Sequence, residues 1–375
     1  MRVLHCEGGR CGEEGHEAAR YGRIGDVRTH PDDDDPGFAS PMPMNRSDAM
    51  PARDPGFALG EPAWLGASQG HRIAWWQGGD ADGLPLLLLH GGPGGCTRPE
   101  ALAAWQGLPL RWVAFDQRGC GRSQPPGETR HNRLDALVAD IERLRQALGV
   151  ERWAVAAGSW GACVALACLL RHPRRIAGLF LRSPFLGSPA EVGRYLAAWP
   201  QWLGEAGQRA LGGDAQALPR LFQPATGARH GATGPAQMSA SLDDEALLAD
   251  AGSRFDDAQS QPGGVASSGA RWQPPATPPA APAAWHVFIH YAQHGWFLRR
   301  PLLDALHRAP RFAGPLALVH GALDACCDPA TSRALAAWHG AADLSEVGDG
   351  GHRMTQPAMA AALRAAAQRW VSRLT

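Results

Sequence analysis

The segment Trp153-Ala-Val-Ala-Ala-Gly-Ser-Trp-Gly161 joins a short apolar run to a Gly-Ser-Trp-Gly turn. The run predicts a buried strand, and residues 159–170 have the apolar spacing of a helix. A serine in a sharp strand-to-helix turn needs small neighbours, because the turn is tight and the serine backbone is strained. Ala157, Gly158 and Gly161 meet this requirement, with Ala157 in place of the usual first glycine. The turn fits a nucleophile elbow, and by itself it fits an ordinary Gly/Ser turn equally well.

Short apolar runs of this kind alternate along the chain with segments of helical spacing. At 134–148 and 329–338, for example, apolar residues recur every three or four positions, which is typical of helices. A strand, a helix and a further strand, repeated in this way, predict an α/β fold with a mostly parallel sheet flanked by helices on both faces. The expected strands lie at 85–89, 111–115, 153–157, 176–181, 315–319 and 344–347.

The alternation divides the chain into three parts. Residues 1–58 are rich in Gly, Pro, Asp and Arg without a period of 2 or 3.6, so we expect a disordered or spurious N-terminal extension there. The core is expected at 59–183 and 311–375. The insertion at 184–310 interrupts the alternation and predicts a helical cap over a site. Within the cap, helices are expected at 191–211 and 284–307, around a mobile segment rich in Pro, Ala and Gly.

A serine hydroxyl becomes a good nucleophile only when a base removes its proton and a third group holds that base. Two later strand ends carry suitable residues, Asp324 after the run at 315–319 and His352 after the run at 344–347. Each alone has an ordinary interpretation, as a helix N-cap and as a loop histidine. The order Ser159, Asp324, His352 at successive strand ends is instead typical of the α/β-hydrolase fold, and predicts a nucleophile, an orienting carboxylate and a general base.

Acyl transfer also requires backbone N–H groups aimed at the negative charge that develops on the substrate oxygen. Trp160, directly after the serine, is expected to supply one of these oxyanion-hole donors. The loop His90-Gly-Gly-Pro-Gly-Gly95 is expected to supply the other, from Gly92 or else from Gly91, because Pro93 has no N–H. A glycine-rich turn that only reverses the chain is the alternative. A phosphate-binding loop is not, because no Gly-Lys-Ser/Thr follows.

The composition of the chain indicates which binding partners and which cellular compartment to expect. The 36 basic and 36 acidic residues give zero formal net charge, and the basic residues form no run. The sequence therefore shows no cluster of positive charge of the kind that binds nucleic acid. The longest apolar run, 84–89, is far too short to span a membrane, and the N-terminus lacks the apolar core of a signal peptide. The eight cysteines show no paired C-x-x-C spacing, so we expect a reduced, cytoplasmic protein. Together with the charge and the short apolar runs, this leads us to expect no binding to nucleic acid or membrane.

Two clusters of histidine and cysteine are candidates for metal or thiol chemistry. His286, His290 and His294 recur every four residues on a predicted helix, a spacing that zinc sites use. No acidic residue lies among them, so a role in lining the cap or in packing is favoured, and neither a metal nor an organic cofactor is expected. Cys326 and Cys327 follow the candidate aspartate closely and are expected to pack inertly, with a reactive thiol as the alternative.

Six short motifs are spread over the chain from about Trp64 to the C-terminus: His90-Gly-Gly-Pro-Gly-Gly95, Asp116-Gln-Arg-Gly-Cys-Gly-Arg-Ser123, Gly158-Ser-Trp-Gly161, Leu181-Arg-Ser-Pro-Phe185, His290-Tyr291 and Val319-His-Gly-Ala-Leu-Asp324. Together they resemble the proline iminopeptidases (prolyl aminopeptidases), a family of α/β-hydrolase serine peptidases. The resemblance is patchy in the cap. It implies removal of an N-terminal proline from peptides without a cofactor, and it implies the same roles for the serine, aspartate and histidine.

The cap departs from the family pattern where the substrate's free amine would bind. The resemblance implies two glutamates there, but this chain has Phe288 two residues before His290-Tyr291, and Gln273 after a cap tryptophan. We therefore expect Phe288, Gln273, His290 and Tyr291 to line the substrate pocket without that carboxylate pair. A buried ammonium without a carboxylate partner is strongly unfavourable. Five acidic residues are candidates to replace the pair: Glu191, Glu205, Asp243, Asp244 and Glu245.

The preferred hypothesis is a serine hydrolase that cleaves an N-terminal prolyl residue from small peptides or amides through an acyl-enzyme on Ser159. A carboxylesterase on the same scaffold is the alternative that the missing glutamates favour. A catalytically silent binding protein of this fold is the third hypothesis, and the intact set of Ser159, Asp324 and His352 argues against it. The expected partners are small peptide, amide or ester substrates.

Overall fold

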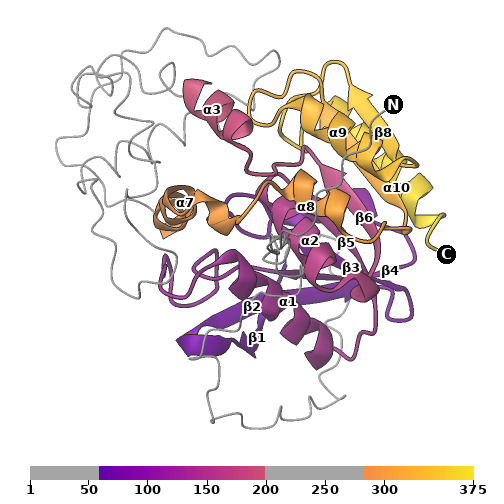
Figure 1. The fold of residues 1–375 in the computed structure, drawn as a ribbon. Helices are drawn as coiled ribbons and strands as arrows, with labels where there is room; N and C mark the ends of the chain where they lie inside the picture. The colour runs from indigo at the N-terminus through magenta and orange to yellow at the C-terminus, as the bar shows by residue number, and fades with distance from the viewer. Residues whose placement is uncertain (1–58, 199–282) are drawn as a thin grey trace, which may run out of the picture. The chain divides into compact units, whose positions relative to one another are not determined.

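The computed structural model describes residues 59–198 and 283–375, which form an eight-stranded sheet with helices packed against it (Figure 1). The expectations for 1–58 and for most of the cap lie outside the described residues. The strands are β1 (Ala63–Gly66), β2 (Arg72–Gly79), β3 (Leu84–Leu89), β4 (Leu110–Phe115), β5 (Trp153–Gly158), β6 (Ile176–Arg182), β7 (Leu316–Gly321) and β8 (Asp343–Val347). The α-helices are α1 (Leu134–Ala147), α2 (Trp160–Arg171), α3 (Pro189–Ala198), α7 (Ala283–Gln293), α8 (Leu302–Arg308), α9 (Pro329–His339) and α10 (Pro357–Val371). Short 3-10 helices are η2 (Ser68–Gly70), η3 (Pro99–Trp105), η4 (Pro173–Arg175) and η5 (Gly295–Phe297).

The strand order is β1-β2-β4-β3-β5-β6-β7-β8. From β4 to β8 every neighbouring pair is parallel, whereas β1 pairs with β2, and β2 with β4, in antiparallel register. The expected mostly parallel sheet is confirmed. The two antiparallel strands were not among the expected strands: β1 has only four residues, mostly exposed, and the apolar run of β2, 73–76, was not recognised as a strand.

The side chains of β3 point alternately into two hydrophobic cores, one on each face of the sheet. Leu87 and Leu89 belong to the core that α1 and α2 cover, and Leu86 and Leu88 belong to the core that α10 covers. A strand that is buried on both faces has no polar positions, which explains the uninterrupted apolar run in the sequence. Since β3 and β5–β8 run parallel, their carboxyl ends lie along one edge of the sheet, where ligands bind in open α/β folds.

The prediction of a single helix at 284–307 is wrong, because the chain forms α7, η5 and α8 in succession there. Trp296 and Phe297 have φ values of 59° and 56°, in the left-handed region that ends an α-helix. Pro301 then stands at the N-cap of α8, where its missing N–H costs nothing. Of the helix expected at 191–211, the part up to the end of α3 is helical and the remainder lies outside the described residues.

A buried arginine holds the long loop that follows β4. Arg118 is fully buried, and its guanidinium donates to the Asp140 carboxylate on α1 at 2.6 and 2.9 Å. It also donates to the His131 carbonyl and to the Ser68 hydroxyl, each at 2.8 Å. A buried charge pair is tolerated when its remaining hydrogen bonds are satisfied, as they are here. The loop is therefore tied to α1 and to the segment between β1 and β2.

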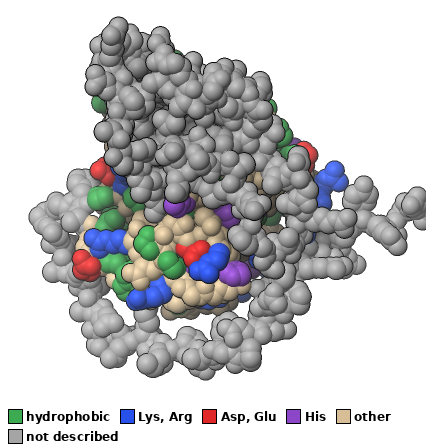
Figure 2. All heavy atoms as spheres, turned by 90° about the vertical axis from the view of Figure 1, so that its left-hand side faces the viewer, with side chains coloured by type: hydrophobic (Ala, Val, Ile, Leu, Met, Phe, Trp, Pro, Cys, Tyr) green, Lys and Arg blue, Asp and Glu red, His purple; other side chains and the backbone are tan. Residues whose placement is uncertain are grey.

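Figure 2 shows the left-hand face of Figure 1 with its side chains coloured by type. On the described part of this face, acidic, basic, histidine and hydrophobic side chains lie side by side, without a broad patch of one charge. None of the helices within 59–198 and 283–375 is long and apolar enough to cross a membrane.

Removal of Asp140 should leave the Arg118 charge buried without its carboxylate. We expect Asp140→Ala to lower the free energy of unfolding by roughly 3–5 kcal/mol, as is typical of a broken buried ion pair. Urea denaturation followed by circular dichroism measures the change. The exposed pair of Arg333 and Glu346 gives the control, since Glu346→Ala should leave the urea midpoint nearly unchanged. Similar effects of the two substitutions would contradict this account of the loop.

Candidate active site

Ser159 lies at the turn between β5 and α2, in a backbone conformation that residues other than glycine rarely adopt. Its φ and ψ are 53° and −126°. Main-chain hydrogen bonds hold the turn: the Ser159 N–H donates to the Arg182 carbonyl at 3.0 Å, and the Ser159 carbonyl accepts from the N–H groups of Ala162 and Phe185. Strained residues persist only where their surroundings fix them, and they cluster at functional sites.

Two glycines make room for this turn. A Cβ on Gly158 would collide with the Arg182 guanidinium, and a Cβ on Gly161 would lie 2.7 Å from the Leu89 carbonyl oxygen. The spacing of small residues in the sequence therefore has a steric cause on each side of the serine. Because Gly161 lacks a side chain, the amino end of α2 packs directly against the end of β3.

Asp324 and His352 follow β7 and β8, and the pairing of these two strands brings their side chains together. His352 Nδ1 lies 2.8 Å from Asp324 Oδ2, and it donates the hydrogen bond because an ionised carboxylate only accepts. The second carboxylate oxygen, Oδ1, accepts the N–H groups of Cys326 and Cys327, both at 2.8 Å. Asp324 is 1% exposed, so these bonds replace the water that a buried carboxylate loses.

The charges of this pair favour each other. Burial alone raises the pKa of Asp324, but the charge of His352 and hydrogen bonds from its neighbours hold that pKa well below its usual range. Burial lowers the pKa of His352, but the Asp324 carboxylate outweighs burial and raises that pKa above its ordinary value. A hydrogen bond with Cys326, and burial, keep the pKa of Cys327 well above its ordinary value. Near neutral pH Cys327 is therefore a thiol, and Asp324 is the group that favours the imidazolium.

The Cys327 thiol lies near both the serine and the histidine. Its Sγ lies 3.9 Å from Ser159 Oγ and within 4.8 Å of a ring nitrogen of His352. The serine, the aspartate and the histidine singled out from the sequence thus converge at one edge of the sheet. This thiol is also part of the site, although inert packing was the first expectation for it.

The glycine loop after β3 lies against the serine. A Cβ on Gly91 would be 3.3 Å from Ser159 Cβ and 3.9 Å from Ser159 Oγ. Gly92 has a φ of 125°, which favours glycine, and it precedes Pro93. The Trp160 N–H belongs to the first turn of α2, whose N–H groups have no partner within the helix. The loop and the helix end therefore flank Ser159, while the donor roles of Gly92 and Trp160 stay predictions.

Gln117, which the sequence analysis did not single out, connects this loop to the elbow. Its backbone N–H donates to His90 Nε2, its Nε2 donates to the His90 carbonyl, and its Oε1 accepts from Trp160 Nε1, each at 2.9 Å. Burial lowers the pKa of His90, which favours the neutral ring that can accept a hydrogen bond. The only signal for Gln117 in the sequence was its place in the motif at 116–123.

Arg182 positions the loop that carries the histidine. It lies at the end of β6, where burial lowers its pKa, and its Nη1 donates to the His352 carbonyl. The same guanidinium lies over Gly158 of the elbow. Arg182 therefore links the serine turn to the histidine loop, a role that the motif at 181–185 did not reveal by itself.

Aromatic side chains form a wall beside the elbow. Trp296 packs against three rings, with centroid distances of 5.9, 5.0 and 5.7 Å to Trp160, Phe185 and Phe288. Phe288 also lies 6.0 Å from the ring of Tyr195 on α3. The position where the resemblance implies a glutamate is thus part of an aromatic cluster.

His290 and Tyr291 hold α7 against the loop that follows β4. His290 Nε2 is 2.9 Å from the Asn132 carbonyl oxygen, and the Tyr291 hydroxyl donates to Asn132 Oδ1 at 2.9 Å. Burial and the nearby His294 lower the pKa of His290 to about 4, so this ring is neutral. Contact of His290 and Tyr291 with substrate stays a prediction, and Gln273 lies outside the described residues.

Glu191 is the described member of the acidic residues considered for amine binding. Its Oε1 accepts from the Leu186 N–H and the Thr331 hydroxyl, and its Oε2 accepts from the Ser188 N–H. The Ser188 hydroxyl accepts in return from the Glu191 N–H, which forms a capping box at the start of α3. This carboxylate is therefore occupied in holding α3. The other candidates, Glu205, Asp243, Asp244 and Glu245, lie outside the described residues.

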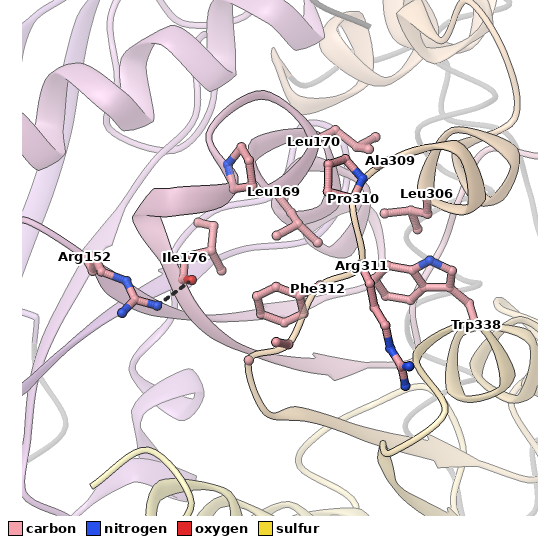
Figure 3. A pocket seen from close by; sticks show the side chains of 13 residues that line it. Arg152, Leu169, Leu170, Ile176, Leu306, Ala309, Pro310, Arg311, Phe312 and Trp338 are labelled. Carbon is pink, nitrogen blue, oxygen red and sulfur yellow. Dashed lines mark hydrogen bonds between the residues drawn. The ribbon is translucent and has the colours of Figure 1, made fainter.

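A pocket of about 240 Å³ lies away from these residues (Figure 3). Leu169, Ile176 and Phe312 contribute to its apolar walls, and Arg152 and Arg311 border it. It is formed at the amino ends of β5, β6 and β7, whereas the candidate site follows the carboxyl ends of these strands. The pocket therefore has no part in the chemistry of Ser159.

Comparison with known proteins agrees with this geometry. Residues 84–354 match the family described as the alpha/beta hydrolase fold, a range that exceeds half of the chain and contains Ser159, Asp324 and His352. The chain belongs to the α/β-hydrolase fold family.

Among curated proteins, this α/β hydrolase is related to proline iminopeptidases, which confirms the resemblance in its motifs. The proline iminopeptidase of Neisseria gonorrhoeae is 43% identical over 144 residues, which are 38% of this chain and 44% of that protein. The proline iminopeptidase of Arabidopsis thaliana is 40% identical over 151 residues, which are 40% of this chain and 38% of that protein. Each match spans less than half of the relative's length.

Two solved structures show how widely the fold is shared. A proline iminopeptidase-related protein from Thermus thermophilus has a TM-score of 0.54 and 25% identity, covering 83% of this chain and 98% of that chain. A thermophilic esterase from Thermogutta terrifontis has a TM-score of 0.51 and 19% identity, covering 84% and 99%. The second likeness supports the α/β-hydrolase fold alone.

Asp324 should hold the pKa of His352 above the ordinary value of about 6.5. Because the carboxylate favours the protonated ring, we expect Asp324→Asn to lower that pKa. NMR titration of ring carbons in protein labelled at histidine measures the shift, with the exposed His307 as the internal control. An unchanged His352 titration in the variant would show that the hydrogen bond does not set this pKa.

Proposed function

We propose that this α/β hydrolase is a serine hydrolase that removes an N-terminal, preferentially prolyl, residue from small peptides or amides through an acyl-enzyme on Ser159. The observation that carries the proposal is the 2.8 Å hydrogen bond between His352 Nδ1 and Asp324 Oδ2, beside a serine with φ of 53°. This bond fixes the proton on Nδ1 and leaves Nε2 as the base. The relationship to proline iminopeptidases supports a peptide substrate.

In the first half of the reaction Ser159 Oγ attacks the carbonyl carbon next to the scissile bond, while His352 Nε2 takes the hydroxyl proton. Asp324 stabilises the imidazolium and keeps the ring oriented. Negative charge on the carbonyl oxygen is stabilised by the N–H groups of Trp160 and Gly92. The imidazolium then gives its proton to the leaving amine, and the acyl-enzyme remains.

In the second half a water molecule replaces the amine and the steps run in reverse. His352 Nε2 takes a proton from water, the hydroxide oxygen bonds to the acyl carbon, and the ester bond to Ser159 breaks. The serine regains its proton from the imidazolium. The imidazole of His352 therefore carries every proton that moves in the two halves of the reaction.

A carboxylesterase is the second candidate, and the apolar surroundings of Phe288 favour it. Among the residues that the structure describes, the ring lies against the aromatic faces of Trp296 and Tyr195. Glu191 does not compensate, since its oxygens accept hydrogen bonds from Ser188, just before α3, and from Thr331 on α9. Cation–π contact recovers only about 1–2 kcal/mol, so the site favours substrates whose recognition does not depend on a free amine.

Ser159 should be the residue that reacts with an active-site probe. We expect a fluorophosphonate to modify Ser159 in the wild-type protein and to leave Ser159→Ala unmodified, because only this serine stands in the elbow. Peptide mapping by mass spectrometry locates the adduct. Ser345→Ala, on β8 and bound to Arg369, should react like the wild type. An adduct on any other serine would remove the basis of the proposal.

Hydrolysis should accelerate as pH rises through a single ionisation of His352, because only the neutral ring accepts the serine proton. Since Asp324 raises the pKa of His352, the midpoint should lie above about 6.5. The pH profile of kcat/KM measures it. His352→Ala should lose at least ~10³-fold in kcat, and His307→Ala should keep the wild-type profile. A wild-type rate in His352→Ala would exclude the histidine as the base.

The pocket should discriminate weakly between substrates with and without a free amine. We expect prolyl and N-acetyl-prolyl arylamides to differ by less than about tenfold in kcat/KM, or ~1.4 kcal/mol. Phe288→Glu should increase the preference for the free amine, because it returns a carboxylate to the cap. Short-chain aryl esters in the same panel test the second candidate. A wild-type preference far above tenfold would show that another acidic group binds the amine.

A further inference from the structure

Two cysteines and the histidine of the candidate active site form a cluster of metal-binding type. Cys326, Cys327 and His352 each offer one ligand atom, and the three atoms all lie within 4.8 Å of one another. The cysteines follow β7 and the histidine follows β8, so the pairing of these strands creates the cluster from two loops. Both cysteines are free thiols, and Cys326 and His352 are partly exposed, which gives an ion access.

One carboxylate orients all three ligands. Asp324 Oδ1 accepts the N–H groups of both cysteines, and Oδ2 accepts from His352 Nδ1. Because Nδ1 is occupied, Nε2 is the ring nitrogen that remains for a metal. A carboxylate on the other ring nitrogen is the usual support of a metal-binding histidine. His320 fixes the same turn through a 3.1 Å bond to the Cys327 carbonyl.

The donor set selects a thiophilic cation. Two thiolates and an imidazole suit zinc and similar ions, whereas magnesium and calcium require oxygen ligands. Tetrahedral bonds of about 2.3 Å to sulfur and about 2.0 Å to nitrogen place ligand atoms roughly 3.5–4 Å apart. Ligand atoms within 4.8 Å of one another therefore need to approach by about 1.3 Å at most. A water molecule would complete the coordination, next to Ser159 Oγ, which lies 3.9 Å from Cys327 Sγ.

We propose that Cys326, Cys327 and His352 bind a thiophilic divalent cation of the zinc class, and that the bound cation switches off hydrolysis. On binding, each thiol releases its proton to solvent as its sulfur–metal bond forms, and Nε2 donates its lone pair to the ion. That lone pair is the one that takes the serine proton. The inhibition therefore rests on the proposed function, whereas the binding does not.

Cobalt(II), a spectroscopic substitute for zinc, tests binding on the full chain after chelator treatment and reduction. We expect thiolate-to-cobalt charge-transfer absorption that saturates at one equivalent and is displaced by zinc. Cys326→Ser should weaken cobalt binding at least ~10-fold, and Cys327→Ser should do the same. Cys96→Ser, a partly exposed thiol elsewhere, should leave the spectrum unchanged. If the wild type shows no charge-transfer absorption, the metal site does not exist. The proposal is also overturned if Cys326→Ser, folded like the wild type by circular dichroism, keeps the full absorption.

Inhibition is measured separately, as the zinc concentration that halves each variant's own metal-free rate. We expect inhibition of the wild type that a chelator reverses, and an increase of at least ~10-fold in that concentration for Cys326→Ser but none for Cys96→Ser. Ser159→Ala has no rate to inhibit, yet it should bind cobalt like the wild type. If the protein hydrolyses no substrate, the cobalt spectra still decide whether the metal site exists. Full activity with zinc bound would overturn the inhibitory role.

Discussion

The parallel hydrogen bonding of β5 to β6, β6 to β7 and β7 to β8 is the constraint on which the site depends. It brings the ends of strands that are far apart in the sequence to one edge of the sheet. Ser159 follows the first of these strands, Asp324 the third and His352 the fourth. β5, β6 and β7 each lie buried between two neighbouring strands, and β8 pairs with β7 at the edge of the sheet. A shift of register by one residue in a buried strand would move all of its side chains to the opposite face. The core thereby fixes the positions of residues that contribute nothing to it.

At that edge a single carboxylate organises the chemistry. Asp324 has one oxygen on the imidazole and the other on two backbone N–H groups, and its near-complete burial makes each bond stronger than it would be in water. The consequence is a histidine whose proton position is defined. The same bonds hold the turn that brings the Cys327 thiol next to Ser159 and within 4.8 Å of the imidazole. The proposed general base and the proposed metal site thus depend on the same hydrogen bonds of Asp324.

The surroundings explain why the relationship to proline iminopeptidases does not by itself establish the substrate. Gln117 and Arg182 brace the loops around the serine through buried hydrogen bonds, and these belong to motifs shared with proline iminopeptidases. The cap differs, because Phe288 stands in an aromatic cluster and Glu191 caps a helix. The residues proposed for acyl transfer and the cap position where the resemblance implies amine binding therefore lie on different elements of this chain.

The sequence by itself determined the α/β fold and the three candidate residues, because the signals are local. A strand buried on both faces must be apolar throughout, and a serine elbow must have small neighbours such as Gly158 and Gly161. Tertiary structure decided what depends on contacts between distant segments. The break near Trp296 is a matter of backbone conformation, and the contact of Cys327 with Ser159 requires β5 and β7 to lie in one sheet. From the sequence, the Glu191 carboxylate was a candidate to bind the substrate amine. Only the fold shows that it is already hydrogen-bonded, because its partner Thr331 is 140 positions away along the chain.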